Sequence, residues 1–123
     1  MTVREVYERG ISHLPEVPSD NPDLQNYILN WTNEMLAETF HIENSIRKHY
    51  EMELLTEPQV VSSLNDEIEY NWRLVYAAFP YGIAAQAFID DDNDYRSNKF
   101  GQQYVLRCNE AIINEVENII DCY

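Results

Sequence analysis

The sequence contains little glycine, proline or positive charge, and each shortage excludes a class of protein. Its 123 residues include three glycines and five prolines, too few turn residues for a sandwich or barrel of many short strands. No stretch reaches 18 apolar residues and no apolar run follows a basic N-terminus, so we expect neither a membrane span nor a signal peptide. The length suits one domain, residues 1–123, with a single hydrophobic core.

Two cysteines are too few, and too far apart in the sequence, to predict a disulfide or a metal site. Cys108 and Cys122 would lie about 21 Å apart along the axis of a shared helix, beyond the reach of a disulfide. Neither belongs to a CxxC pair. We therefore expect reduced thiols, as in an intracellular protein.

Positive charge is also scarce. Eight lysines and arginines face 22 aspartates and glutamates, and the formal net charge is −14. Affinity for nucleic acids depends on cations that neutralise phosphates, so this balance argues against conventional DNA or RNA binding. The acids form either an ordinary solvated surface or a negative field that the protein uses.

The sequence does contain helical patterns. Thr2 precedes Glu5 by three residues, which is the spacing of a capping box, and predicts a short first helix that ends between Gly10 and His13. Three prolines in residues 15–22 then interrupt regular structure, and Asp20 is the expected N-cap of the next helix.

The strongest helix prediction covers residues 23–49. Its apolar side chains recur at three-, four- and seven-residue spacings, at Leu24, Ile28, Trp31, Met35, Ile42 and Ile46. Arg47 and Lys48 near its end agree with the helix dipole. A second long helix is predicted for residues 93–120, with one apolar face formed by Val105, Ile112, Val116 and Ile119.

The segments between these helices differ in character. Residues 51–69 lack periodicity and predict an irregular connection, with a short strand at residues 59–61. Residues 70–89 have a helical pattern, but Pro80 and Gly82 predict two helices or a sharp kink near residues 79–80. The expected fold class is all-α: a compact bundle of four or five helices, two of them long.

The run FIDDDNDYRSNKF, residues 88–100, could hold calcium or could end one helix and begin another. Loop positions one, three and five of an EF-hand are matched by Asp90, Asp92 and Asp94. Positions six and twelve require glycine and glutamate, but they are Tyr95 and Gly101. We therefore predict no metal here, and we expect one of the residues 91–94 to cap the final helix.

Glu38 and His41 form a Glu-x-x-His pair, the ligand spacing of di-iron bundles. Such bundles use two of these pairs and two further glutamates, whereas the signature occurs here once. No GxSxG motif, glycine-rich phosphate loop or Cys–His neighbourhood is present. We expect no enzyme activity, no cofactor and no metal.

Nine tyrosines and two tryptophans favour a protein that forms interfaces, because aromatic anchors supply contact area with little loss of entropy. The C-terminal stretch VENIIDCY places Ile119, Ile120 and Tyr123 near the end of the sequence. We expect these three residues to bind a partner, a neighbouring ring in the assembly considered next.

Three stretches resemble small proteins encoded near the capsid genes of tailed bacteriophages. They are TVREVYERG at residues 2–10, ILNWTNEMLAETFHIENSIR at residues 28–47 and FPYGIAAQAFIDDDND at residues 79–94. Together they cover somewhat over a third of the chain. The proteins that they resemble are head–tail connector, or adaptor, subunits.

The resemblance implies a helical subunit of a ring, commonly of twelve copies, that docks beneath the portal protein and extends the DNA channel toward a downstream tail or stopper protein. It implies no catalysis, and a location at the head–tail interface of the virion, with the host cytoplasm during assembly. Twelve copies would carry roughly −170 formal charges, and a negative channel wall would let DNA pass without specific binding.

Two other functions stay open. An acidic DNA mimic that inhibits a host nuclease or restriction system would also be small and negative. It predicts carboxylates spaced along one face like phosphates, whereas the acids here are scattered among arginines and lysines. A metal-dependent helical-bundle enzyme would need more ligands than Glu38 and His41 supply.

Overall fold

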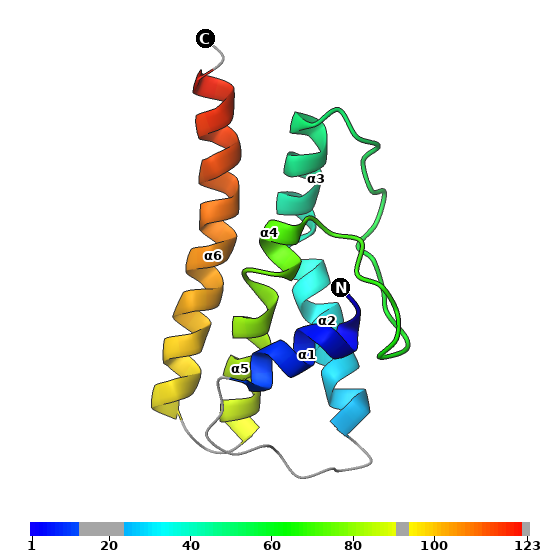
Figure 1. The fold of residues 1–123 in the computed structure, drawn as a ribbon, viewed down its shortest axis with the longest axis vertical. Helices are drawn as coiled ribbons and strands as arrows, with labels where there is room; N and C mark the ends of the chain where they lie inside the picture. The colour runs from blue at the N-terminus through cyan, green and yellow to red at the C-terminus, as the bar shows by residue number, and fades with distance from the viewer. Residues whose placement is uncertain (13–23, 91–93, 122–123) are drawn as a thin grey trace.

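The computed structural model describes residues 1–12, 24–90 and 94–121, and over these ranges the protein is built from α-helices, which confirms the predicted all-α class. The helices are α1 (Val3–Ile11), α2 (Leu24–Glu38), α3 (Phe40–His49), α4 (Trp72–Val75), α5 (Phe79–Asp90) and α6 (Asp94–Asp121). α6 stands as a long rod beside α5, and α1 crosses α5 on another side (Figure 1). α5 is therefore the centre of the bundle.

The first helix begins where the capping box predicts. The Glu5 backbone N–H donates to the Thr2 hydroxyl at 3.2 Å, and the Thr2 backbone N–H donates to the Glu5 carboxylate at 3.2 Å. At the other end of α1, a Cβ added to Gly10 would lie 2.9 Å from the carbonyl oxygen of Pro80 in α5. A side chain at position 10 would therefore force the two helices apart.

The single helix predicted for residues 23–49 is wrong at Thr39, which separates α2 from α3. Thr39 has φ −98° and ψ 6°, and its hydroxyl donates to the carbonyl oxygen of Met35 at 2.7 Å. Such back-bonding by a buried threonine bends a helix. Two backbone hydrogen bonds still cross the junction, so α2 and α3 follow each other as a bent rod.

The connection between α3 and α4 is irregular, as predicted, but the strand predicted at residues 59–61 is wrong. The Gln59 side chain takes the place of strand pairing, since its amide donates to the Glu67 carbonyl at 2.7 Å and accepts from the Glu69 N–H at 2.8 Å. Asn33 and Asn44 bind the backbone of Val61 and Leu55 in the same two-sided way. Side-chain amides thus satisfy this backbone without a sheet.

The prediction of two helices near Pro80 is confirmed by α4 and α5. Asn71 caps α4, because its side chain accepts a hydrogen bond from the Arg73 N–H at 3.0 Å. Pro80 lies in the first turn of α5, where its missing N–H has no partner to lose. The following Ile83, Ala84 and Ala85 are buried.

The final helix is confirmed as α6, and the two described residues of its predicted apolar face are exposed. Val105 and Ile112 are 55% and 37% exposed, whereas the side that packs on the bundle carries Ser97, Cys108 and Ala111. The Ser97 hydroxyl donates to the Ala85 carbonyl of α5 at 3.0 Å. Packing of the bundle therefore leaves these two apolar side chains of α6 partly exposed to solvent.

A buried ion pair within α3 also bonds the segment before α4. Arg47 Nε lies 3.0 Å from Glu43 Oε2, and the Glu43 side chain is 2% exposed. The second carboxylate oxygen accepts from the Asn71 N–H. Arg47 also donates to the carbonyl oxygens of Glu53 and Glu69. These bonds attach both ends of the irregular connection to α3.

Candidate functional site

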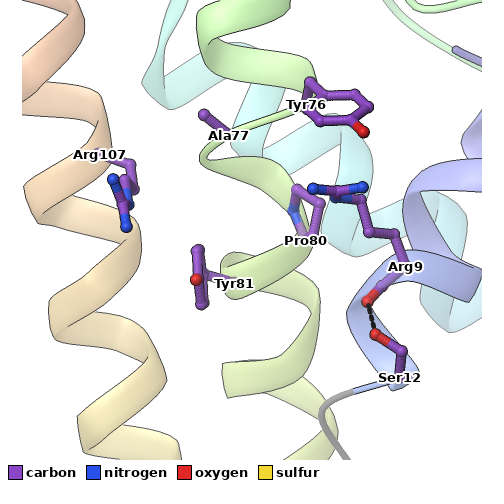
Figure 2. Close-up of a pocket in the computed structure, with 7 residues that line it drawn as sticks. All are labelled: Arg9, Ser12, Tyr76, Ala77, Pro80, Tyr81 and Arg107. Atoms are coloured by element: carbon purple, nitrogen blue, oxygen red, sulfur yellow. Dashed lines mark hydrogen bonds between the residues drawn. The ribbon is translucent and has the colours of Figure 1, made fainter.

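A pocket of about 430 Å³ opens between the end of α1, the turn from α4 to α5, and α6. Its lining residues are Arg9, Ser12, Tyr76, Ala77, Pro80, Tyr81 and Arg107. Figure 2 shows Arg9 alongside Tyr76 on one side and Arg107 facing Tyr81 on the other. We call this the arginine pocket. Among the described residues, its lining contains two arginines and no acidic side chain.

The last turn of α1 positions Arg9. Val3, Val6 and Gly10 face the core, so Arg9 projects from the exposed side of the helix. Its guanidinium carbon lies 3.8 Å from the centre of the Tyr76 ring, a cation–π contact that holds the charge in place. A cation in the last turn also complements the helix dipole.

Arg107 reaches the pocket from the middle of α6. Its guanidinium carbon lies 5.8 Å from the centre of the Tyr81 ring, and Nη1 lies 3.2 Å from Glu110 Oε2. Its Nε is buried and has no hydrogen-bond partner among the described residues. A buried donor without a partner is uncommon. The rest of the side chain is 39% exposed, so the part of Arg107 that faces the pocket is its guanidinium end.

Aromatic side chains continue the arginine pocket onto the surface of α4. Trp72 is 64% exposed, and it precedes Tyr76 by four residues, so the two rings lie on one side of this turn. The Arg73 guanidinium lies 5.6 Å from the Trp72 ring centre. Tryptophan, tyrosine and arginine are the residues most enriched at the energetic centres of protein interfaces.

The arginine pocket offers positive charge and hydrogen-bond donors, which are the groups that an anion needs. The Ser12 hydroxyl donates to the Arg9 carbonyl at 2.6 Å, as the dashed line in Figure 2 marks. Among the described lining residues, the only other hydroxyls are those of the two tyrosines, and there is no thiol or carboxylate. Positive charge held by aromatic rings can recognise an anionic group without reacting with it.

A second, wider hollow of about 780 Å³ lies between α2, α5 and α6, and we call it the α5–α6 groove. Its lining residues are Glu38, Gly82, Ala85, Gln86, Ser97, Asn98, Gly101, Gln102, Tyr104, Val105, Leu106 and Asn109. Val105 and Leu106 are about half exposed at its edge. Val105 lies about 200° around α6 from Arg107, so the groove and the arginine pocket occupy opposite flanks of this helix.

Tyr104 lines the groove, and Cys108, one turn further along α6, is buried. The Tyr104 hydroxyl donates to Glu38 Oε2 at 3.2 Å. Burial, and then the nearby Cys108 and Glu38, raise the pKa of Tyr104 far above its ordinary value. Burial raises the pKa of the Cys108 thiol to about 11, against a smaller lowering by the Tyr104 hydrogen bond. Both groups are therefore protonated and unreactive at neutral pH.

The structure does not bring the sequence-predicted metal candidates together. Glu38 bonds Tyr104, while the exposed His41 packs against Phe40 with ring centres 5.6 Å apart. Within the described ranges, no group of three or more potential ligands could hold a metal ion. Of the acidic run, residues 91–93 lie outside those ranges, so the predicted cap is not tested, and Asp94 begins α6. The predicted N-cap at Asp20 also lies outside them.

The predicted partner-binding residues lie at the C-terminal limit of the residues that the structure describes. The backbone of Ile119 and Ile120 belongs to α6, but their side chains lie outside what the structure describes, and Tyr123 lies outside it entirely. The sequence reasoning did not single out Arg9 or Arg107. Their only sequence signal is the scarcity of positive charge in an acidic chain, which makes any pairing of two arginines unusual.

Comparison with known proteins finds no matching family model, no matching curated protein and no matching solved structure. Among the helices in the described ranges, none combines the length and the apolar character needed to cross a membrane. Over the described residues the protein is all-helical, with a pocket lined by two arginines on one flank of α6 and an open groove on the other.

Proposed function

We propose that the protein is a subunit of a head–tail connector, or adaptor, ring of a tailed bacteriophage. In this role it docks beneath the portal protein, extends the DNA channel and meets a tail or stopper protein below. The observation that carries the proposal is the pair of unlike surfaces on opposite flanks of α6, together with the three stretches that resemble such proteins. The proposed role requires neither catalysis nor a cofactor.

Unlike surfaces are what a ring needs. In a closed ring one face of each subunit meets a different face of the next, so the two faces have different composition. The arginine pocket is basic and aromatic, whereas the α5–α6 groove is lined by small and uncharged polar residues and by the half-exposed Val105 and Leu106. Gly101, with no atom within 4 Å of an added Cβ, lets a helix of a neighbouring subunit approach closely.

The exposed apolar stripe of α6 also supports association. Val105, Leu106 and Ile112 are each more than a third exposed on one helix. Exposed apolar side chains that lie close together mark sites of protein–protein contact. In a ring, this stripe is buried against the adjacent subunit.

The charge suits a DNA channel that does not hold its cargo. A net charge of −14 per subunit gives the assembled ring a negative field that repels the phosphate backbone. The duplex therefore slides through during packaging and ejection. Within the virion the protein lies at the head–tail interface, and before assembly it is in the host cytoplasm.

Light scattering of the purified protein, alone and mixed with a candidate portal protein, tests the proposal. We expect a ring alone or a ring that forms on the portal. Leu106→Asp in the groove edge is expected to abolish the ring, and Val60→Asp, at a 76% exposed position of the connection, is the matched control that leaves it intact.

Two results would contradict the ring. A protein that stays monomeric or dimeric with the portal and inhibits a nuclease would support the acidic DNA mimic in its place. Tight binding of duplex DNA by the assembled ring at low salt would refute the proposed use of the charge, because a repulsive channel cannot bind its cargo.

A further inference from the structure

We propose that the arginine pocket binds a carboxylate side chain of a protein partner. The proposal concerns the chemistry of the partner and goes beyond the ring, since the pocket is complete within one subunit. It rests on three features of the described residues: the local charge, the arrangement of the guanidinium groups and the size of the pocket.

The local charge is opposite to that of the whole chain. Acids outnumber bases by 22 to 8 in the sequence, yet the part of this pocket that the structure describes is lined by two arginines and no acid. No carboxylate among the described residues forms an ion pair with Arg9, and Arg107 pairs with Glu110 through Nη1 alone. Positive charge in the pocket is therefore incompletely neutralised and attracts an anion.

The guanidinium groups are arranged to donate hydrogen bonds. Tyr76 covers one face of Arg9 and Tyr81 lies beside Arg107, and ring contacts of this kind leave the N–H edges of the guanidinium available. The Arg107 side chain is 39% exposed, and only Nη1 pairs with Glu110. A carboxylate oxygen can therefore accept from the exposed part of this guanidinium and form a charge-assisted bond, stronger than a neutral one.

The size and the surroundings favour a protein side chain over a nucleic acid. A pocket of about 430 Å³ accommodates an aspartate or glutamate side chain with part of its backbone. Nucleic-acid binding instead needs many cations along a groove, which an acidic surface of this kind does not provide. The exposed Trp72 and Tyr76 beside the pocket supply the apolar contact area of a protein interface.

The test is an NMR titration of the full chain labelled with ¹⁵N, which observes the Arg107 Nε–Hε signal directly. The probe is N-acetyl-diglutamate amide, and the control ligand is the diglutamine peptide at equal ionic strength. We expect the Arg107 signal to shift with diglutamate and not with diglutamine.

Variants separate the pocket from general charge attraction. Arg9→Gln and Arg107→Lys are each expected to weaken diglutamate binding about tenfold, because each removes a charge-assisted hydrogen bond. Arg4→Gln changes the charge equally on the same helix but lies outside the pocket lining, so it should alter the affinity less than twofold.

Several outcomes would overturn the proposal. An Arg107 signal that does not respond to diglutamate, or an Arg4→Gln effect as large as that of Arg9→Gln, would show that the pocket does not select carboxylates. Tighter binding of inorganic phosphate or of a short single-stranded DNA would assign the pocket to phosphate instead. The titration is repeated with Leu106→Asp, which is outside the pocket lining and is expected to abolish the ring, so its result is independent of whether a ring forms.

Discussion

Removal of the Arg47 guanidinium should produce one of the largest losses of stability from a single substitution in this protein. In Arg47→Met the Glu43 carboxylate stays 2% exposed and keeps the Asn71 N–H as its remaining donor. Breaking a buried ion pair from one side costs about 3–5 kcal/mol. Arg47 is itself 14% exposed, so we expect the lower end, about 3 kcal/mol.

Urea denaturation measures this cost. With a denaturant slope of about 1.5 kcal/mol per molar, a loss of 3 kcal/mol lowers the urea midpoint by about 2 M. The control is Glu110→Gln, which removes the exposed Arg107–Glu110 pair, whose side chains are 39% and 46% exposed. Exposed pairs contribute less than about 1 kcal/mol.

The double variant Glu43→Leu with Arg47→Met tests whether the cost comes from an uncompensated buried charge. Replacing both partners removes that charge, so the double variant should cost at least about 1 kcal/mol less than the sum of the two single variants. Additive single effects, or an Arg47→Met cost no larger than that of Glu110→Gln, would refute the reasoning.

Three further predictions use the same stability assay or simple chemistry. Gly10→Ala should lower the free energy of unfolding by about 1–3 kcal/mol, because the new methyl group meets a backbone oxygen of α5. Gly101→Ala, with no atom within 4 Å of the added carbon, should raise the free energy of unfolding by about 0.5–1 kcal/mol. Changes of the same sign in the two variants would contradict the expected contrast. Glu51→Gly should raise the thermal midpoint and stabilise by about 1 kcal/mol, because φ at Glu51 is 58°; Glu51→Ala is the control that should not. In a Cys122→Ser background, the Cys108 thiol of the folded protein should react with a disulfide reagent at pH 8 at least about a hundredfold more slowly than that of the urea-unfolded protein, because it is buried. Burial raises the folded pKa of Cys108 from 9.0 to about 11, so its contribution to stability is present below pH 9 and is lost as the pH rises toward 11. Cys108→Ala should therefore show a shallower loss of stability over that range.

Features that depend on neighbouring residues alone were predictable. The capping box at Thr2, the irregular residues 51–69 and the interruption of the helical pattern near residues 79–80 follow from short-range chemistry, and the structure confirms each of them. The break at Thr39 was missed because nothing in the local pattern distinguishes Thr39 from Thr32. Both are buried and both hydroxyls bond the preceding turn, yet α2 continues through Thr32 and ends before Thr39.

The orientation of α6 shows the limit of periodicity more clearly. Val105 and Ile112 form a regular apolar face, yet the bundle packs on the side that carries Tyr104 and Cys108. Gly82 of α5 permits this, since its missing side chain leaves room for the Tyr104 ring. The side of α6 that packs into the core therefore depends on the shape of α5, and not on which side of α6 is most apolar.

The sequence by itself determined the helical class, the positions where most helices begin and end, and the acidic character of the protein, because propensity, capping and composition act over a few residues. Only the tertiary structure decided which side chains contact the two arginines of the pocket. Arg9 lies against Tyr76, and Arg107 against Tyr81, across long stretches of chain. Contacts of this kind arise from the packing of α1 and α6 on α5, so the arginine pocket exists only in the folded protein.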